Sequence, residues 1–235
     1  DGRRFGDAVQ SMFTGTDKLR ETADAIRDST HGEVQIGVTP VLLYQVTPEA
    51  IAKLHRSKPN LKVGLKVDNS SGLIDSVIMQ RLDVAVVNVY RRPDTLHVLY
   101  ERVLHYVCLL PEQHVLAQST ESVDLNMLEH LDCVAYDRTR LQSAQHDWLR
   151  LLSWPQASLS SYSNIAVASL ARATGKLAIV DPYTAKTIAA LGGVVTRPIA
   201  QRLTSTLCVV ARGVDTLSLA ARELADAVIA ELELT

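Results

Sequence analysis

The chain has 235 residues, of which 47% are hydrophobic and 21% are charged, and its formal net charge is -2 at pH 7. This composition is typical of a globular protein with a substantial core, in one large domain or two small ones. The nearly balanced charge gives no basis for electrostatic binding of nucleic acid, which requires clustered Lys and Arg. No apolar run approaches the roughly 20 residues that cross a bilayer, so we predict no membrane span.

Residues 1–31 show the heptad pattern of a dimerising linker helix. Apolar side chains recur at spacings of four and three, which is the a/d repeat of a two-stranded coiled coil. The predicted dimer contacts are Phe5, Val9, Met12, Leu19, Ala23 and Ile26. Because the chain begins inside helical sequence, we expect a folded segment to precede it. The periodic apolar residues and interspersed acidic residues exclude a signal peptide.

The rest of the chain alternates between predicted strands and helices. Strands are predicted over residues 33–39, 61–67, 83–89, 158–162, 177–180 and 206–210, with a longer strand-like stretch over 96–110. Helices are predicted over 42–57, 73–81, 165–173 and 182–190, and from a cap at Asp215 towards the C-terminus. Alternation of this kind is typical of an α/β fold with parallel sheets.

The long stretch over 96–110 divides these elements into two series. We therefore predict two βα lobes with a hinge and a cleft between them. The first lobe comprises residues 32–111 and 206–235, and the second comprises residues 112–205, because the last strand and helix return to the first lobe. A cleft between lobes is the expected position of a small ligand.

Small polar side chains stand where the predicted strands give way to helices. They are Thr39, Asn69-Ser70-Ser71-Gly72, Ser163-Asn164 and Asp181-Pro182. Capping of a helix N-terminus alone explains any one of these junctions. Taken together, they also predict a carboxylate-binding site, because helices that start at the carboxyl ends of parallel strands present free N–H groups and partial positive charge. The sequence leaves both interpretations open.

Signatures of enzymes and metal sites are absent from the sequence. There is no Gly-x-Ser-x-Gly elbow, no Gly-x-Gly-x-x-Gly loop and no phosphate-binding loop, and the seven His residues form no His-x-x-x-His pair. We therefore predict no catalytic residue, no metal and no cofactor. Cys108, Cys133 and Cys208 lie far apart in apolar runs, which predicts buried free thiols in the reducing cytoplasm.

Over nearly all of its length the chain resembles the linker helix and effector-binding domain of LysR-type transcriptional regulators. The segments that carry the resemblance are, in chain order, residues 1–5, 31–37, 43–48, 70–71, 82–86 and 175–180. The family's fold is the two-lobed type II periplasmic-binding-protein fold. The resemblance implies a winged helix-turn-helix DNA-binding domain that is absent from this chain, and a homodimer or homotetramer on DNA.

The resemblance also implies a small effector in the interlobe cleft that changes the arrangement of the oligomer. By position, the effector-binding residues are Thr39, Ser70, Ser71, Asn88, Tyr136, Asp137, Asn164 and Asp181. Residues 179–185 resemble family members that respond to amino acids or opines, so we expect an amino acid, an opine or another carboxylate. In this interpretation Asp181 pairs with the effector's ammonium group. The alternative is that Asp181 only caps the following helix.

Two other classes of protein share parts of this pattern. A solute-binding protein of a transporter has the same lobes and cleft, but the dimerising helix, the three unpaired cysteines and the lack of an export signal favour the regulator. A domain that only oligomerises would need its cleft filled by its own side chains, and Tyr136 or Tyr183 is large enough to do so.

Overall fold

The computed structural model describes residues 32–89, 94–128, 132–137, 157–215 and 217–234. The chain divides into two compact units, which we call the first lobe (residues up to Arg102 and from Thr206) and the second lobe (Val103–Ser205). The predicted linker helix lies outside the described residues, as do its proposed dimer contacts Phe5, Val9, Met12, Leu19, Ala23 and Ile26.

The long strand predicted over 96–110 is in fact two strands, β4 (His97–His105) and β5 (Val107–Pro111). Tyr106 separates them, and its N–H donates to the carbonyl of Leu203 at 3.0 Å. The chain passes from the first lobe to the second between residues 102 and 103, whereas the sequence placed this boundary between 111 and 112. The difference arises because β5 pairs with strands of the second lobe.

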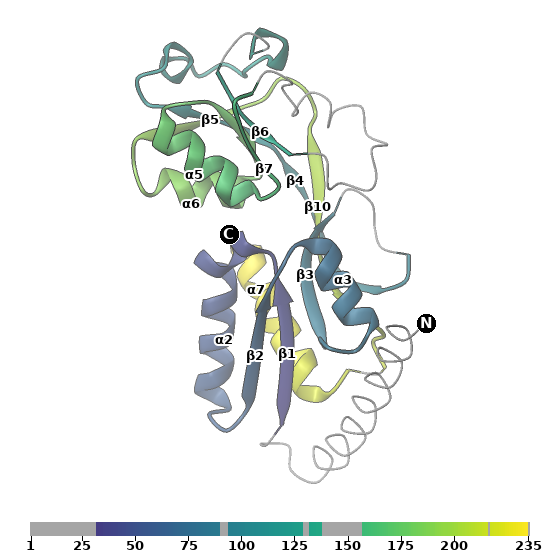
Figure 1. Cartoon of the computed structure of the whole chain (residues 1–235). Coiled ribbons are helices and arrows are strands. Elements are labelled where there is room, and N and C mark those ends of the chain that lie inside the picture. The colour runs from purple at the N-terminus through teal and green to yellow at the C-terminus, as the bar shows by residue number, and fades with distance from the viewer. Residues whose placement is uncertain (1–31, 90–93, 129–131, 138–156, 216, 235) are drawn as a thin grey trace. The chain divides into compact units, whose positions relative to one another are not determined.

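The first lobe is built on a five-stranded sheet in the order β2-β1-β3-β10-β4 (Figure 1). Its remaining strands are β1 (Glu33–Val38), β2 (Lys62–Val67), β3 (Val84–Val89) and β10 (Thr204–Ala211). β1 pairs in parallel with β2 and β3, so the predicted parallel arrangement is confirmed for these strands. β10 runs antiparallel to β3, as expected for a segment that returns from the other lobe.

Helices cover both faces of this sheet (Figure 1). They are α2 (Val46–Ser57), α3 (Ser70–Ile78) and α7 (Leu219–Leu234). Successive side chains of a strand point to opposite faces, so fully buried Ile36 and Val38 face α2 and α7, while Gly37 faces α3. A Cβ at Gly37 would lie 2.5 Å from Leu82 Cδ1. A larger residue at this position would therefore require the Leu82 and Leu73 side chains to shift.

Three predicted helix starts differ from the structure, and the first is that of α3, which begins at Ser70 instead of residue 73. The helix predicted over 42–57 is interrupted, because a 3-10 turn, η1 (Pro40–Tyr44), precedes α2. The predicted cap at Asp215 is wrong, because α7 begins at Leu219 and the Ser218 hydroxyl accepts the Ala221 N–H at 3.1 Å. A hydroxyl three residues before a free N–H is the usual capping geometry, and Ser218 provides it.

The second lobe has a mixed sheet rather than the predicted parallel one. β5 lies between β8 (Ala178–Val180) and β9 (Val194–Pro198) and runs antiparallel to both. β6 (Val134–Tyr136) pairs in parallel with β7 (Leu159–Ser161), and a parallel bridge from Cys133 to Leu177 sets β6 beside β8. The sequence missed β9 because Thr196, Arg197 and Pro198 give it a polar end.

In the described residues of the second lobe, two helices and two short 3-10 turns accompany the strands. They are α5 (Asn164–Thr174), α6 (Pro182–Ala189), η2 (Val115–Gln118) and η3 (Leu125–Leu128). α5 and α6 pack together, and their small buried residues join a core that includes Leu109 and Val180 (Figure 1). Gly175, with φ of +68°, ends α5 in the left-handed conformation, as its sequence position predicted.

The three cysteines are free and fully buried, as predicted. Burial raises the pKa of the Cys108 thiol far above its ordinary value, and burial together with the nearby Asp132 raises the pKa of Cys133 to about 12. Both lie in the core on the side of the second-lobe sheet away from α5. Their thiolate forms are therefore strongly disfavoured.

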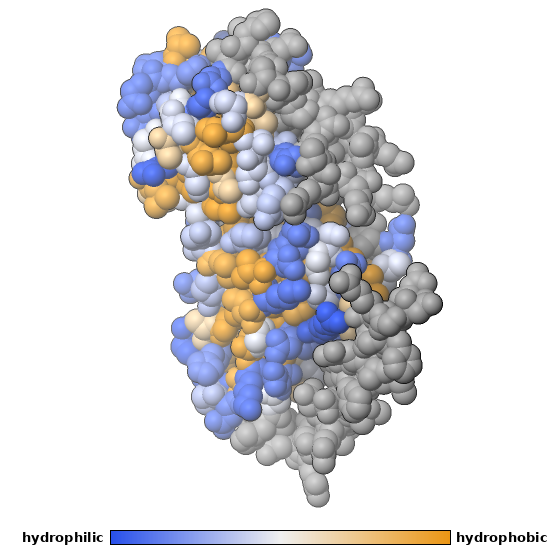
Figure 2. All heavy atoms as spheres, viewed as in Figure 1, coloured by the Kyte–Doolittle hydropathy of each residue, from blue (hydrophilic) through white to orange (hydrophobic). Residues whose placement is uncertain are grey.

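The outer edge of the first-lobe sheet is partly apolar. β2 is the edge strand, and its Leu65 and Val67 are 41% and 43% exposed. Figure 2 shows apolar residues gathered on this face of the first lobe. Lys62 and Lys66 alternate with them along the strand, which puts charge at an edge that would otherwise favour pairing with another strand. Among the described residues, no helix has the length and apolar character needed to cross a membrane.

The packing of α7 predicts that replacing two of its leucines will have different effects on the free energy of unfolding. Leu224 is fully buried, whereas Leu219 is 61% exposed. We expect Leu224→Ala to lower the free energy of unfolding by about 2–5 kcal/mol, because it leaves a cavity in the core. Leu219→Ala should change it by less than about 0.5 kcal/mol. Urea unfolding followed by circular dichroism measures both, and equal losses would contradict this placement of α7.

Candidate functional site

The carboxyl ends of the three parallel strands of the first lobe lie at one edge of the sheet. Thr39 follows β1, Asp68 follows β2 and Asn88 lies near the end of β3. Two backbone hydrogen bonds hold these ends together: the Thr39 N–H donates to the Val86 carbonyl and the Asp68 N–H to the Val38 carbonyl, each at 3.3 Å. Three of the predicted site residues, Thr39, Ser70 and Asn88, thus meet at this edge.

The hydrogen of the Ser70 hydroxyl is already used by the protein. The hydroxyl donates to the Asn88 carbonyl at 2.8 Å and accepts the Asn88 N–H at 3.0 Å. Because a hydroxyl has one hydrogen to donate, Ser70 has none left for an effector carboxylate. Its role in this structure is to tie the start of α3 to the end of β3. Ser71, the next residue, is exposed in the first turn of α3.

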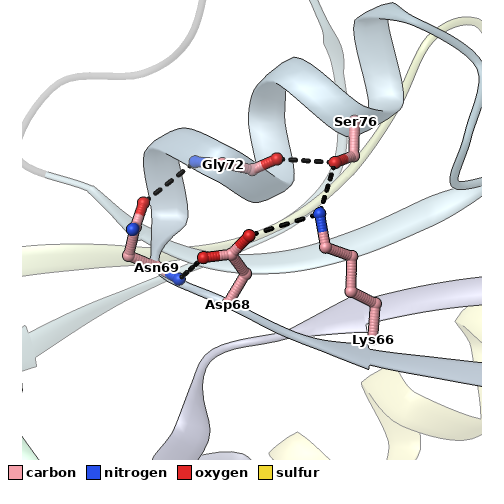
Figure 3. A network of polar contacts seen from close by, with 5 residues as sticks. All are labelled: Lys66, Asp68, Asn69, Gly72 and Ser76. Atoms are coloured by element: carbon pink, nitrogen blue, oxygen red, sulfur yellow. Dashed lines mark hydrogen bonds and ion pairs between the residues drawn. The ribbon is translucent and has the colours of Figure 1, made fainter.

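The start of α3 is held by a polar network, of which the sequence predicted only the capping (Figure 3). Asn69 caps the helix, and its side-chain oxygen accepts the Gly72 N–H at 2.9 Å. Asp68 accepts the Asn69 N–H at 2.8 Å and lies 3.2 Å from the Lys66 ammonium. That ammonium also donates to the Ser76 hydroxyl at 2.9 Å. The protein thus places its own carboxylate, neutralised by a lysine, at the N-terminus of α3.

Two polar atoms at the same edge have no partner among the described residues. They are the Thr39 hydroxyl oxygen and the Asn88 side-chain oxygen, and both are buried. Thr39 occupies the capping position of η1, yet its side chain makes no capping hydrogen bond. A buried polar group without a hydrogen bond costs about 1–3 kcal/mol. These two atoms are therefore buried groups with unused bonding capacity at this edge of the first-lobe sheet.

In the second lobe, the predicted site residues follow strands that run in the same direction. Tyr136 and Asp137 stand at the end of β6, Asn164 opens the helix after β7, and Asp181 follows β8. The Asp137 N–H donates to the Ser161 carbonyl at 2.8 Å, which continues the pairing of β6 and β7. Parallel pairing brings these positions to one edge of the sheet.

Asp181 caps α6, so its predicted capping role is confirmed, and its contact with an effector stays a prediction. Its carboxylate is 2% exposed and accepts the Thr184 N–H at 2.9 Å and the Thr184 hydroxyl at 2.6 Å. It also accepts the side-chain N–H of Asn164 at 3.0 Å. Thr184 was missed from the sequence because the capping box has Glu or Gln, not Thr, at the third residue after the cap. Ser163, at the capping position of α5, makes no side-chain capping bond.

Opposing effects act on the pKa of Asp181. Burial raises it above the ordinary value, and the hydrogen bonds from Thr184, Asn164 and the Tyr183 N–H act in the opposite direction. Burial is the larger effect, so the pKa of Asp181 is raised overall.

Among the described residues, no cluster of His, Cys, Asp and Glu is suited to a metal ion.

This upward shift predicts a pH dependence of stability. A carboxyl whose folded-state pKa is raised contributes stability below its unfolded pKa of about 3.9, and that contribution is lost as the pH rises through the folded-state pKa. We therefore expect the wild type to lose stability relative to Asp181→Asn as the pH rises from 3 to 8. Urea unfolding of both proteins across this range measures the difference. A difference that grows in favour of the wild type would show that the hydrogen bonds outweigh burial.

Comparison with known proteins identifies the family. A family model described as the LysR substrate binding domain matches residues 27–233. Transcriptional activator protein LysR of Escherichia coli (strain K12) is 24% identical over 200 residues, which cover 83% of this chain and 63% of that protein. The chain thus spans less than two thirds of this relative.

Two solved structures share the fold at low sequence identity. Full-length CbnR complexed with its target DNA has a TM-score of 0.67 at 12% identity, covering 98% of this chain and 81% of that one. The effector binding domain of QuiR in complex with shikimate has a TM-score of 0.66 at 15% identity, covering 85% of this chain and 96% of that one. The predicted α/β fold with two lobes of the type II periplasmic-binding-protein class is confirmed. Since the family model matches most of its length, the chain belongs to the LysR family of transcriptional regulators, of which it carries the substrate-binding domain.

Proposed function

We propose that this chain senses a small carboxylate effector and passes the signal to a DNA-binding domain that lies outside it. The family match supports the sensing role, and QuiR, which shares the fold, is bound to shikimate. CbnR, which also shares it, is complexed with DNA. We further propose that the regulator acts in the cytoplasm as a homodimer or homotetramer joined through residues 1–31. The curated relatives are regulators, and we propose no catalytic role.

The observation that carries the proposal is the pair of unpartnered polar atoms in the first lobe. The Thr39 hydroxyl can donate a hydrogen bond and the Asn88 side-chain oxygen can accept one. Leaving them unpaired costs stability, and a bound effector that pairs them recovers that cost. The Thr39 hydroxyl is suited to a carboxylate oxygen of the effector. Ser70 serves by holding Asn88 in place, since both of its hydrogen bonds go to the Asn88 backbone.

The amino-acid or opine class of effector stays a prediction. It was based on residues 179–185 and on a direct contact from Asp181 to an ammonium group. In the structure Asp181 is buried and accepts three hydrogen bonds, so an ammonium would have to displace one of those donors. The position of the effector between the lobes also stays a prediction. A regulatory effect requires that the effector bind one arrangement of the lobes or subunits better than another.

A thermal-shift screen tests the carboxylate proposal. The probes are amino acids, opines, and aliphatic and aromatic carboxylates, each at millimolar concentration. An effector at 100 times its dissociation constant adds about 2.7 kcal/mol of stability, which raises the melting midpoint by several degrees. If none of these carboxylates raised the melting midpoint, the carboxylate proposal would be contradicted.

The Thr39→Val variant tests the site itself. Valine keeps the shape of threonine and removes the unpaired hydroxyl, so without effector the variant should be as stable as the wild type or more stable. Its affinity for the effector should fall roughly five- to tenfold, the equivalent of one hydrogen bond. Calorimetric titration and urea unfolding measure the two effects.

Thr47→Val is the matched control for this experiment. Thr47 is also in the first lobe, is fully buried and has an unpartnered hydroxyl, but it lies within α2. Its replacement should have a similar effect on stability and leave the effector affinity unchanged. If both variants lost affinity equally, the effect would come from the fold and Thr39 would not be a contact.

A further inference from the structure

Ser205 lies near the start of β10 and has a buried hydroxyl that makes no hydrogen bond among the described residues. The residue is 3% exposed, and its hydroxyl oxygen is fully enclosed. β10 begins at Thr204, and the chain enters the first lobe between Ser205 and Thr206. The unpaired hydroxyl therefore lies beside one of the two points at which the chain crosses between the lobes.

The pairing of β10 with β3 places a second unpartnered oxygen on the same face of the sheet. Leu207 lies opposite Asn88 in this antiparallel pair, so their side chains share a face. Ser205, two residues before Leu207, is on that face as well, whereas Cys208 faces the core next to α3. The Asn88 side-chain oxygen is buried and, in the described part of the chain, has no partner either.

The two oxygens are chemically complementary and are separated by the spacing of the sheet. Diagonal neighbours on one face of an antiparallel pair lie about 7–8 Å apart, measured between their backbones. An amide oxygen accepts hydrogen bonds, and a hydroxyl both donates and accepts them. A water molecule with hydrogen bonds of about 2.8 Å on either side can join two such side chains. Ser205 is also smaller than Leu207 and Val209, the next residues on that face, which favours room for one water molecule.

We propose that Asn88 and Ser205 together hold a buried water molecule that fastens β10 to β3. The water donates a hydrogen bond to the Asn88 side-chain oxygen and accepts one from the Ser205 hydroxyl, so both buried groups are paired. Buried waters in proteins serve polar groups of this kind. The inference goes beyond the proposed function and needs no effector, because the amide oxygen of Asn88 has a second lone pair that stays available to one.

This water links the crossing strand to the edge of the sheet that carries Thr39 and Asn88. Ser70 binds the backbone of Asn88 at the start of α3, and the water binds the Asn88 side chain. A continuous path of hydrogen bonds then runs from α3 through β3 to β10. It ends at Ser205, the last residue before the chain enters the first lobe.

Magnetic relaxation dispersion of water tests the site directly, because it counts the water molecules that stay bound inside a protein in solution. We expect Ser205→Ala to lower this count by about one in the full chain, since the water loses one of its two partners. Thr47→Val should leave the count unchanged. Thr47 is the matched control, because it is a fully buried, unpartnered hydroxyl of the first lobe that lies in α2.

Urea unfolding gives a second readout, in which the direction of the change matters. Removing a hydroxyl that has no partner raises the urea midpoint or leaves it unchanged, whereas removing one that binds a buried water lowers it. We expect Ser205→Ala to lower the midpoint. In an Asn88→Ala background the same substitution should have little further effect, because the water is already lost. Ser205→Thr keeps the hydroxyl and should keep the water.

Two outcomes would overturn the inference. If Ser205→Ala raises the urea midpoint or leaves the water count unchanged, the hydroxyl holds no water. If the effects of Ser205→Ala and Asn88→Ala are coupled while the water count stays the same, the hydroxyl donates to Asn88 directly and no water lies between them. None of these measurements uses an effector, so their failure leaves the proposed function untouched.

Discussion

The free N–H groups at helix starts determine which side chains of this domain remain available to a ligand. Each helix begins with N–H groups that have no partner within the helix, and buried ones must find a partner elsewhere. Asn69 and Asp181 meet this need at α3 and α6, and Ser70 is bound to the backbone of β3. Side chains engaged in this way support the fold. Those that the fold leaves unpaired, such as Thr39, are the ones on which recognition can act.

The two lobes differ in how their polar groups are prepared. In the first lobe the fold leaves a hydroxyl and an amide oxygen buried without partners, which is a local cost to stability. In the second lobe the Asp181 carboxylate accepts hydrogen bonds from Asn164 and Thr184, so its burial is compensated within the fold.

Most of the fold was predictable from the sequence, because apolar periodicity and glycine positions are local signals. The parallel strands β1, β2 and β3 and the end of α5 at Gly175 followed from such patterns. The wrong predictions concern features that depend on contacts between residues far apart in the sequence. The break at Tyr106 depends on Leu203, and the antiparallel pairing of β5 depends on strands some 70 to 90 residues later in the chain. The site shows the same division. Capping by Asp181 was readable, whereas the loss of the Ser70 hydroxyl to Asn88 required the three-dimensional structure.

The rate at which the buried thiols react with thiol reagents depends on how often each core of this domain opens. Thiol reagents attack the thiolate, and burial suppresses both the thiolate and access to the sulfur at Cys108 and Cys133. Alkylation can therefore proceed only through transient exposure of the second-lobe core, at a rate set by how often that core opens. Cys208 lies in β10, in a core that includes Leu73 and Val77 of α3, so its alkylation follows the first lobe separately. Alkylation of these three native cysteines thus measures the rate of local opening in each lobe without an added label.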